Sequence, residues 1–427
     1  MQNENLPETA RPFLVAGAPL PAAAFNDLRR RVLLEHCKWD PQVGDVATLA
    51  NFPLLVNRET WNILASLAGA LAGETLAVES EILQTPRLLK QMGLPRRLRH
   101  ALEKVSEHGP AAEAVRVMRF DFHPTTAGWR ISEVNSDVPG GFTEASSYTR
   151  MMSAHYDDAT PAGDPVARWC DAVSKAAGQS GTVALLTAPG FMEDHQITSY
   201  LARHLNVLGC RAQLAGPRQL EWHHGLASLN TASHAVRVDA IIRFYQGEWL
   251  ARLPATSGWE NFFAGGRTPV GNPGSAIISE SKRFPLVWDD LKTSLPVWRR
   301  LLPETRDPRD VPWQGDDAWL LKSAFCNTGD TVSIRSSLSD KAWSAVARSA
   351  RWRPKQWVAQ RRFESVPLAT PIGLMHPCIG VYTVNGRVSG AYARITGGPV
   401  VDFAAIDVPL LILDAGTGGK PVEGFNE

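Results

Sequence analysis

Two short segments constrain the fold of this chain more than any other feature. The segment RFDF (119–122) is followed by a turn rich in Pro and Gly and then by the segment ISEVN (131–135). In both segments polar and apolar side chains alternate with the period of two that is typical of a β-strand. The segments therefore predict a β-hairpin with one polar face and one apolar face.

The spacing of the polar residues also predicts the register of this hairpin. If Asp121 pairs with Glu133, then Arg119 pairs with Asn135, because both pairs of residue numbers have the same sum. These four side chains then share one face of the hairpin, since residues two apart on a strand point to the same side. The opposite face would carry the apolar side chains of Met118, Phe120, Phe122 and Val134.

The polar face predicts a metal site. Two carboxylates that face each other across a strand pair repel, by about 3 kcal/mol at roughly 5 Å and an effective dielectric of about 20. Mg²⁺ would remove this repulsion, and Asp121, Glu133 and Asn135 offer the oxygen ligands that it prefers, with nucleotide phosphates completing the shell. A hairpin whose charges simply face water is the alternative. Without metal, we expect Glu133→Gln to stabilise the protein slightly.

The string RFDF…ISEVNSDVP resembles the Mg-binding hairpin of glutathionylspermidine synthase and its relatives, a circularly permuted branch of the ATP-grasp ligases. The family pattern is R-F-D, a spacer, and then E-x-N-x-D-x-P. The positions that match are Arg119, Asp121, Glu133, Asn135, Asp137 and Pro139. The resemblance extends from about Val115 to Pro409, and the separate amidase domain of the bifunctional family members has no counterpart in this chain.

The resemblance implies a nucleotide site that follows the hairpin in sequence. Lys282, Lys322 and Arg394 would bind the phosphates of ATP together with Arg119, and Gln360 would hydrogen-bond adenine. Arg119 and Arg394 would also act in catalysis, because stabilising a transferring phosphoryl group is mainly electrostatic work for cations.

Two positions depart from the family pattern. Ser323 and the polar loop 327–330 follow Lys322, where relatives carry K-P and a glycine-rich G-R-E-G loop. Ile395 follows Arg394, where relatives often have Glu. A nucleotide-binding protein of the ATP-grasp fold without ligase activity therefore stays open as the alternative function.

The resemblance also implies where the substrates bind. The loop from Ser136 to Thr143, including Asp137, is expected to contact the acid. Glu248, beside Tyr245 and Trp249, would meet a cationic amine through charge and cation–π contact, or would simply begin a helix. The implied reaction is ATP-dependent amide formation through an acylphosphate, with a peptide or amino acid as the acid and an amine or polyamine as the acceptor.

The whole chain predicts an α/β protein with a circularly permuted ATP-grasp core. Periodic apolar positions predict a helical N-terminal segment over residues 1–108. Residues 109–180 would form the first part of the core with the hairpin, and residues 271–427 its second part with the nucleotide site. Between them, residues 181–270 show a β-α-β pattern and would form an additional unit like a pre-ATP-grasp domain. This unit lacks the GxGxxG sequence of dinucleotide-binding folds.

Composition excludes several other classes of protein. With 44 basic and 43 acidic residues the net charge is +1, so the chain is not a globally basic nucleic-acid-binding protein. Residues 341–362 contain seven basic and no acidic residues, which we interpret as an amphipathic helix followed by a strand. The chain contains no apolar run of about 18 residues, so no membrane span is predicted. Five scattered cysteines without zinc spacing indicate a cytoplasmic protein. The sequence leaves the oligomeric state undecided, with a homodimer as one alternative.

Overall fold

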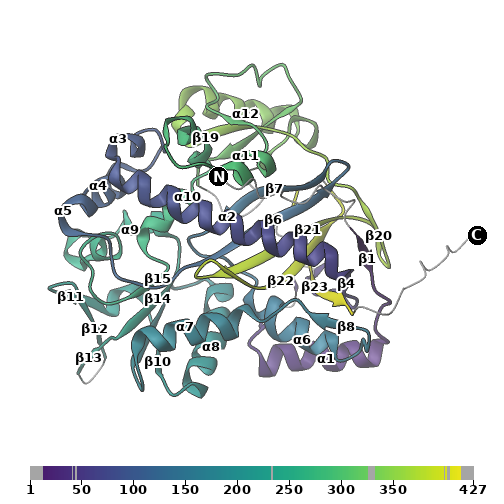
Figure 1. Ribbon diagram of the computed structural model, residues 1–427, viewed down its shortest axis with the longest axis horizontal. Coiled ribbons are helices and arrows are strands. Elements are labelled where there is room, and N and C mark those ends of the chain that lie inside the picture. The colour runs from purple at the N-terminus through teal and green to yellow at the C-terminus, as the bar shows by residue number, and fades with distance from the viewer. Residues whose placement is uncertain are drawn as a thin grey trace, which may run out of the picture.

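The computed structural model describes residues 13–40, 42–43, 46–231, 234–325, 332–398, 400–401 and 404–414. Its centre is a nine-stranded sheet, seen behind the long helix α2 in Figure 1. Seven strands follow one another across this sheet in the order β1 (Leu14–Ala16), β4 (Leu54–Val56), β23 (Ile406–Leu413), β22 (Arg387–Thr396), β21 (Gly373–Val384), β6 (Val117–Thr125) and β7 (Gly128–Asn135). Strand β20 (Leu368–Thr370) pairs with β21, and β8 (Ala159–Pro161) pairs with β23.

The predicted hairpin is formed by β6 and β7, and its predicted register is confirmed. Asp121 pairs with Glu133 and Arg119 with Asn135, while a bulge shifts the register beyond Asp121. The apolar face is buried against the rest of the core, as the alternation requires, through Met118, Phe120, Phe122 and Val134.

The β-α-β prediction is also confirmed. Strands β9 (Thr182–Thr187), β10 (Arg211–Ala215) and β14 (Ala240–Phe244) are parallel, and α8 (Met192–Val207) connects β9 to β10. Two further strands extend the sheet, namely β15 (Val270–Gly271), at the boundary of the predicted unit 181–270, and β5 (Glu113–Val115), from outside it. Helix α7 (Pro165–Ala177) packs against this sheet, and a small antiparallel sheet comprises β11 (Leu220–His223), β12 (Leu226–Asn230) and β13 (Ala235–Arg237).

A four-stranded sheet forms the lobe at the top of Figure 1. Its order is β16 (Thr305–Arg306), β19 (Trp357–Arg361), β17 (Trp319–Ser323) and β18 (Val332–Ser333). Helix α12 (Asp340–Trp352) precedes β19, and its apolar side packs into the small core of this lobe. The interpretation of residues 341–362 as an amphipathic helix and a strand is therefore confirmed.

The N-terminal segment contains the predicted helices, but it is not helical throughout. Its helices are α1 (Ala22–Glu35), α2 (Arg58–Gln84), α3 (Pro86–Leu89), α4 (Arg96–Glu103) and α5 (Val105–His108). Its strand β4 pairs in parallel with β23 near the other end of the chain, so the segment completes the central sheet. Residues 1–108, 109–180 and 271–427 thus share one sheet, whereas the predicted division placed residues 1–108 outside it.

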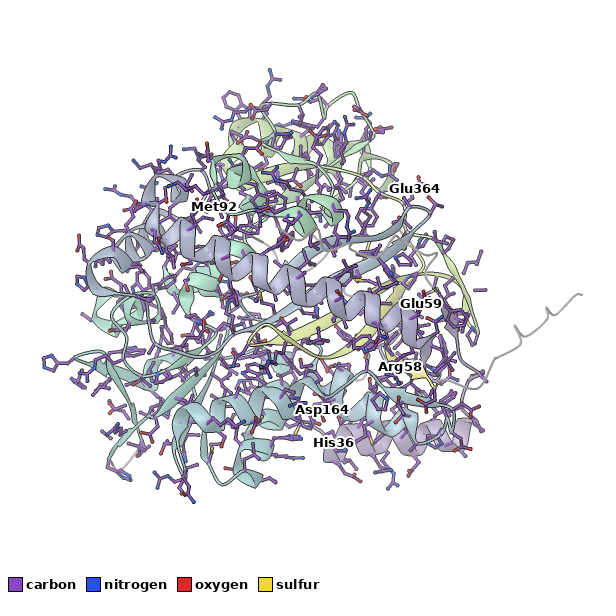
Figure 2. The ribbon with its side chains drawn as sticks, viewed as in Figure 1. His36, Arg58, Glu59, Met92, Asp164 and Glu364 are labelled. Carbon is purple, nitrogen blue, oxygen red and sulfur yellow. The ribbon has the colours of Figure 1, made fainter. Side chains whose placement is uncertain are left out.

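Helix α2 crosses the central sheet and packs on β21 and β22 (Figure 1). Figure 2 labels Arg58 and Glu59 at its first turn and Met92 beyond its last one. The Asn57 side chain accepts a hydrogen bond from the Thr60 amide at 2.8 Å, which caps the first turn. Within the described residues, α2 is the one helix whose length and hydropathy would allow it to cross a membrane. Its buried apolar residues belong to the main hydrophobic core.

Several of the remaining elements connect these sheets. They are η1 (Glu144–Tyr148), α6 (Thr149–Ser153), α9 (Gly247–Leu250), α10 (Ile277–Glu280) and α11 (Pro296–Leu301), together with the short strands β2 (Gln42–Val43) and β3 (Val46–Ala47). Of the residues predicted to meet the substrates, Glu248 lies on α9, which follows β14, whereas Ser136, Asp137 and Thr143 lie between β7 and η1.

Candidate functional site

A cavity of about 340 Å³ lies between the polar face of the hairpin and the four-stranded sheet. Residues from β6, β7, β17, β19, β21 and β22 line it. Six residues predicted for the metal and ATP sites are among them, although they are far apart in sequence: Asp121, Glu133, Lys282, Lys322, Gln360 and Arg394.

Asp121 is the most heavily bonded carboxylate of this cavity. Arg119 donates to both of its oxygens, at 2.8 and 3.0 Å, and Arg394 donates to Oδ2 at 2.7 Å. The Asn135 amide donates to the same Oδ2 at 3.0 Å. Burial opposes ionisation of Asp121, but the two guanidinium groups outweigh it and hold the pKa of this carboxyl well below its usual range. Asp121 is therefore anionic at neutral pH.

The negative charge of Glu133 is likewise compensated by lysine side chains of the same protein. Lys282 Nζ lies 3.2 Å from Glu133 Oε2. Burial opposes ionisation, but Lys282 and then Lys322 lower the pKa of Glu133 despite repulsion from Asp121. Cations from distant segments therefore compensate the repulsion on which the expected stabilisation by Glu133→Gln rested, and we now expect the substitution to destabilise the metal-free protein.

The donor set of the hairpin fits Mg²⁺. Asp121, Glu133 and Asn135 lie on one face, and Asn135 uses its amide nitrogen toward Asp121, which leaves its side-chain oxygen for a metal. Within the described residues, no group of three or more His, Cys, Asp and Glu side chains is arranged to hold a metal. A metal at this hairpin would therefore depend on the amide oxygen and on phosphate oxygens, which is how Mg²⁺ is usually bound beside nucleotides.

The predicted phosphate-binding cations surround the same carboxylates. Lys322, on β17, donates to the Ser132 carbonyl at 3.0 Å, which connects the four-stranded sheet to the hairpin. Arg119 is buried and donates to the Gly140 carbonyl at 3.0 Å. Its side chain does not line the cavity directly but lies behind Asp121 and beside Tyr392, 5.8 Å from the ring centroid.

Gln360 and several apolar side chains also line the cavity. The Gln360 side chain on β19 donates to Thr305 Oγ1 at 2.9 Å, so its amide oxygen is the atom that would accept a bond from an adenine amino group. The apolar lining comprises Leu320, Val332, Ile334, Phe363, Pro367, Val400 and Val401. Such walls suit a flat base, while the charged part of the cavity suits its phosphates.

The structure does not bring the predicted acid-binding residues Ser136 and Asp137 into this cavity. Asp137 is ion-paired with Arg243, and both side chains are inaccessible to solvent. Asp137 Oδ2 also accepts from the Gly247 amide at 2.6 Å, at the start of α9. The Ser136 hydroxyl donates to the Ala276 carbonyl at 3.1 Å. Both side chains therefore have structural contacts.

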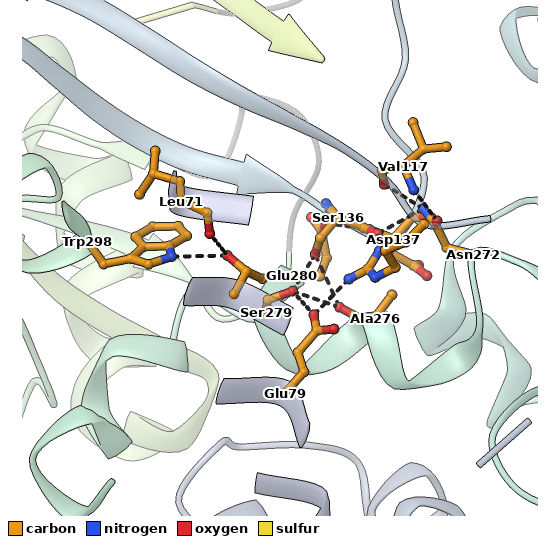
Figure 3. A network of polar contacts seen from close by, with 12 residues as sticks. Leu71, Glu79, Val117, Ser136, Asp137, Asn272, Ala276, Ser279, Glu280 and Trp298 are labelled. Atoms are coloured by element: carbon orange, nitrogen blue, oxygen red, sulfur yellow. Dashed lines mark hydrogen bonds and ion pairs between the residues drawn. The ribbon is translucent and has the colours of Figure 1, made fainter. Parts of the chain in front are cut away.

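These two residues belong to a buried polar network that sequence reasoning missed (Figure 3). The Asn272 side chain accepts from the Val117 amide at 2.7 Å and donates to the Val117 and Ser136 carbonyls at 2.8 and 2.9 Å. Glu280 accepts from the amides of Ser136 and Asp137 at 2.7 and 3.0 Å. The network therefore holds the start of β6 and the end of β7 against the parallel sheet, to which β15 belongs. An Arg within the apolar strand β14 was the one sequence signal for it.

Thr143 and Glu248 lie apart from the cavity but keep unused polar atoms. In the described part of the chain, neither Thr143 Oγ1 nor Glu248 Oε2 has a hydrogen-bond partner, although both atoms are buried. Glu248 lies in the first turn of α9, beside Trp249, whose ring packs 5.1 Å from that of Phe191. Burial, followed by the charges of Asp137 and Glu280, raises the pKa of Glu248 to about 7.

We expect Glu248→Gln to stabilise the protein by about 1–2 kcal/mol at pH 8, because the carboxylate is ionised there while its buried Oε2 has no hydrogen-bond partner among the described residues. A carboxyl whose folded pKa is raised destabilises the native state progressively as pH rises from its unfolded value, near 4.5, to about 7. The gain from the substitution should therefore vanish near pH 4. Urea unfolding at both pH values measures it, with the exposed Glu107→Gln as control. A gain that does not depend on pH would contradict this account.

The sequence matches a family model, and the structure resembles a solved structure. The sequence matches the family described as glutathionylspermidine synthase pre-ATP-grasp over residues 56–413. No curated protein matches the sequence. The structure resembles that of a glutathione synthetase-like effector (GSS30) from Globodera pallida in its apo form, with a TM-score of 0.62 and 11% identity, covering 92% of this chain and 96% of that chain.

A second solved structure is more distant. A putative gamma-glutamylcysteine synthetase from Methylobacillus flagellatus KT has 13% identity and covers 79% of this chain and 86% of that chain, but its TM-score of 0.37 supports no argument. The likeness to the Globodera protein shows a shared fold, and the predicted α/β class is confirmed.

Proposed function

Because this chain belongs to the glutathionylspermidine synthase pre-ATP-grasp family, a family of ATP-dependent ligases, we propose that it joins a carboxylic acid to an amine while ATP is converted to ADP and phosphate. We further propose that its core is a circularly permuted ATP-grasp unit formed by the hairpin and by the chain that follows residue 271. The acid would be a peptide or an amino acid, and the acceptor an amine or polyamine.

The observation that carries the proposal is the pairing of charges around the hairpin. Two carboxylates, Asp121 and Glu133, are in ion pairs with Arg119, Arg394 and Lys282. MgATP would offer new partners to both kinds of group. The carboxylates would bind the metal, and the arginine and lysine side chains would bind the phosphates. The site therefore has the two sets of ligands that MgATP needs, already in contact with each other.

These residues have separate roles in the proposed reaction. Mg²⁺, when bound by Asp121, Glu133 and Asn135, supplies positive charge to the phosphates. Lys282 and Lys322 hold the phosphate chain, and Arg119 and Arg394 stabilise the phosphoryl group as it passes to the acid carboxylate. The amine then attacks the carbonyl carbon of the acylphosphate, a C–N bond forms, the bond to the phosphate oxygen breaks, and the amine nitrogen loses a proton.

Product analysis tests this proposal. With labelled ATP, Mg²⁺ and mixed pools of acids and amines, we expect ADP to form only when both pools are present. AMP as the sole nucleotide product would contradict acylphosphate chemistry. Stabilisation by MgATP without formation of ADP would instead support nucleotide binding without ligation. Arg394→Met should abolish ADP formation, whereas Arg387→Met, an exposed residue on the same strand, should not.

A further inference from the structure

One row of side chains crosses the four-stranded sheet on the side of the cavity. Thr305 on β16 pairs directly with Gln360 on β19, which pairs in turn with Leu320 on β17. Directly paired residues point to the same face of a sheet, so these three side chains share one face. Gln360 and Leu320 line the cavity, whereas Thr305, on the edge strand, is not among the lining residues. Thr305 can therefore act on a ligand in the cavity only through Gln360.

The hydroxyl group of Thr305 has a single proton, and a backbone carbonyl accepts it. Thr305 Oγ1 lies 3.0 Å from the Pro303 carbonyl oxygen, which can only accept a hydrogen bond, so the hydroxyl donates to it. Gln360 Nε2 lies 2.9 Å from the same Oγ1. Because the proton of Thr305 is used by Pro303, Oγ1 can only accept from Gln360. The Gln360 amide must therefore turn its NH2 group toward Thr305 and its oxygen away from it.

Burial makes this orientation of the Gln360 amide costly to reverse. Thr305 is 7% exposed and Gln360 is 4% exposed, so water replaces little of a bond that is lost there. A half turn of the amide would place two acceptor oxygens against each other, unless Thr305 gave up its bond to Pro303. The Gln360 oxygen itself has no hydrogen-bond partner among the residues that the structure describes. It is thus an acceptor of fixed direction that a ligand in the cavity can use.

Strand β17 indicates which part of a nucleotide would lie beside Gln360. Leu320, the direct neighbour of Gln360, gives the cavity an apolar wall. Lys322 lies two residues further along β17, on the same face, and also lines the cavity. A base suits Leu320 and Gln360, and phosphates suit Lys322. An acceptor of fixed direction beside the base favours bases that carry an amino group at that position.

We propose that Thr305 is a positioning residue that determines which class of base the cavity accepts, namely a 6-aminopurine and not a 6-oxopurine. The amino group of adenine donates to the Gln360 oxygen that Thr305 holds in place. The carbonyl oxygen of hypoxanthine or guanine at the same position would meet that oxygen as a second acceptor. This inference rests on the proposed ligase function and names the residue that sets its nucleotide specificity.

The test uses ATP and ITP as probes, because their bases have nearly the same shape and differ around position 6. Calorimetric titration of the full chain with each nucleotide and Mg²⁺, without acid or amine, measures both Kd values. Wild type should bind ATP about 10- to 100-fold more tightly than ITP, because ITP leaves the buried Gln360 oxygen without a donor. Thr305→Val removes the hydroxyl and lets the amide turn. ITP should then bind more tightly, and the preference for ATP should fall about tenfold.

Two further variants separate this role from a general loss of packing or stability. Thr305→Ser keeps the hydroxyl and should keep the wild-type preference for ATP. Thr75→Val is the matched control, because the buried Thr75 hydroxyl has the same pattern of bonds outside the cavity. It donates to the Leu71 carbonyl at 2.7 Å and accepts from the Trp298 indole at 3.0 Å. This control should lose stability but keep the preference for ATP.

Two results would overturn the inference, and one of them does not depend on the variants. A wild type that binds ITP as tightly as ATP contradicts it even if Thr305→Val fails to fold. A folded Thr305→Val with the wild-type preference contradicts it as well. Because binding is measured without turnover, the two proposals are distinguishable. Selective binding of ATP without ADP formation would reject ligation alone, equal use of ATP and ITP by an active enzyme would reject the role of Thr305 alone, and binding of neither nucleotide would reject both.

Discussion

Glu133→Gln is expected to reduce ADP formation by several orders of magnitude and to abolish most of the stabilisation by MgATP. The substitution keeps the shape of the side chain but removes one of two anionic metal ligands. Wild type should be stabilised by MgATP through mass action, by about 2.7 kcal/mol at one hundred times its Kd. Thermal unfolding with and without MgATP measures this difference, and the exposed Glu107→Gln should behave as wild type.

The same variant should be less stable than wild type without ligands, by about 1–3 kcal/mol at pH 7, because Lys282 loses its contact with Glu133. Since the folded pKa of Glu133 is lowered, its contribution is present above its unfolded value near 4.5 and is lost as pH falls through its folded value. The difference in the free energy of unfolding should therefore shrink at low pH. A variant that keeps the full MgATP shift would show that Glu133 is not a metal ligand. A variant that is more stable than wild type without ligands would show that Lys282 does not compensate the repulsion between Glu133 and Asp121.

Arg243→Met should lower the free energy of unfolding by about 3–5 kcal/mol, because it leaves the carboxylate of Asp137 buried without its counter-ion. Urea unfolding at pH 7 measures this loss. Arg237→Met is the matched control. Arg237 lies shortly before Arg243 in sequence and also pairs with an aspartate, Asp239, but its side chain is 77% exposed. An exposed pair is worth about 0–1 kcal/mol.

A double variant separates the ion pair from the rest of the network. Arg243→Met combined with Asp137→Asn should lower the free energy of unfolding clearly less than the sum of the two single substitutions. In the double variant neither partner of the ion pair is left as an unpaired buried charge. The amide oxygen that replaces the carboxylate of Asp137 would still accept a bond from the Gly247 amide. Additive losses would mean that the two residues stabilise the protein independently.

Local pattern was sufficient to predict the hairpin and the β-α-β unit. The register of β6 and β7 follows from polar residues two apart on strands that are joined by a short turn, so no distant segment is needed to specify it. The β-α-β unit was predicted in the same way, from an apolar strand, an amphipathic helix and a second strand in immediate succession. Glu193 and Asp194 lie in the first turn of α8, where acidic side chains interact favourably with the helix dipole.

The loop that was predicted to contact the acid, from Ser136 to Thr143, shows where local pattern is insufficient. The motif match identifies Asp137, but only the position of Arg243 on a parallel strand turns this carboxylate into a buried structural group. In the same way β4 joins the central sheet because β23, near the other end of the chain, offers it a free edge. Neither Arg243 nor β23 can be identified from the residues that surround Asp137 or β4 in sequence.

By itself, the sequence determined which residues share a face: the polar and apolar faces of the hairpin, its register, and the residue types that suit Mg²⁺ and phosphate. Only the tertiary structure decided how these charges are compensated, with Arg394 and Lys282 beside the hairpin carboxylates and Lys38 beside Glu144 and Asp407. The physical reason is that periodicity reports the burial of neighbouring residues, whereas the energy of a charge depends on its distance from every other charge and from water.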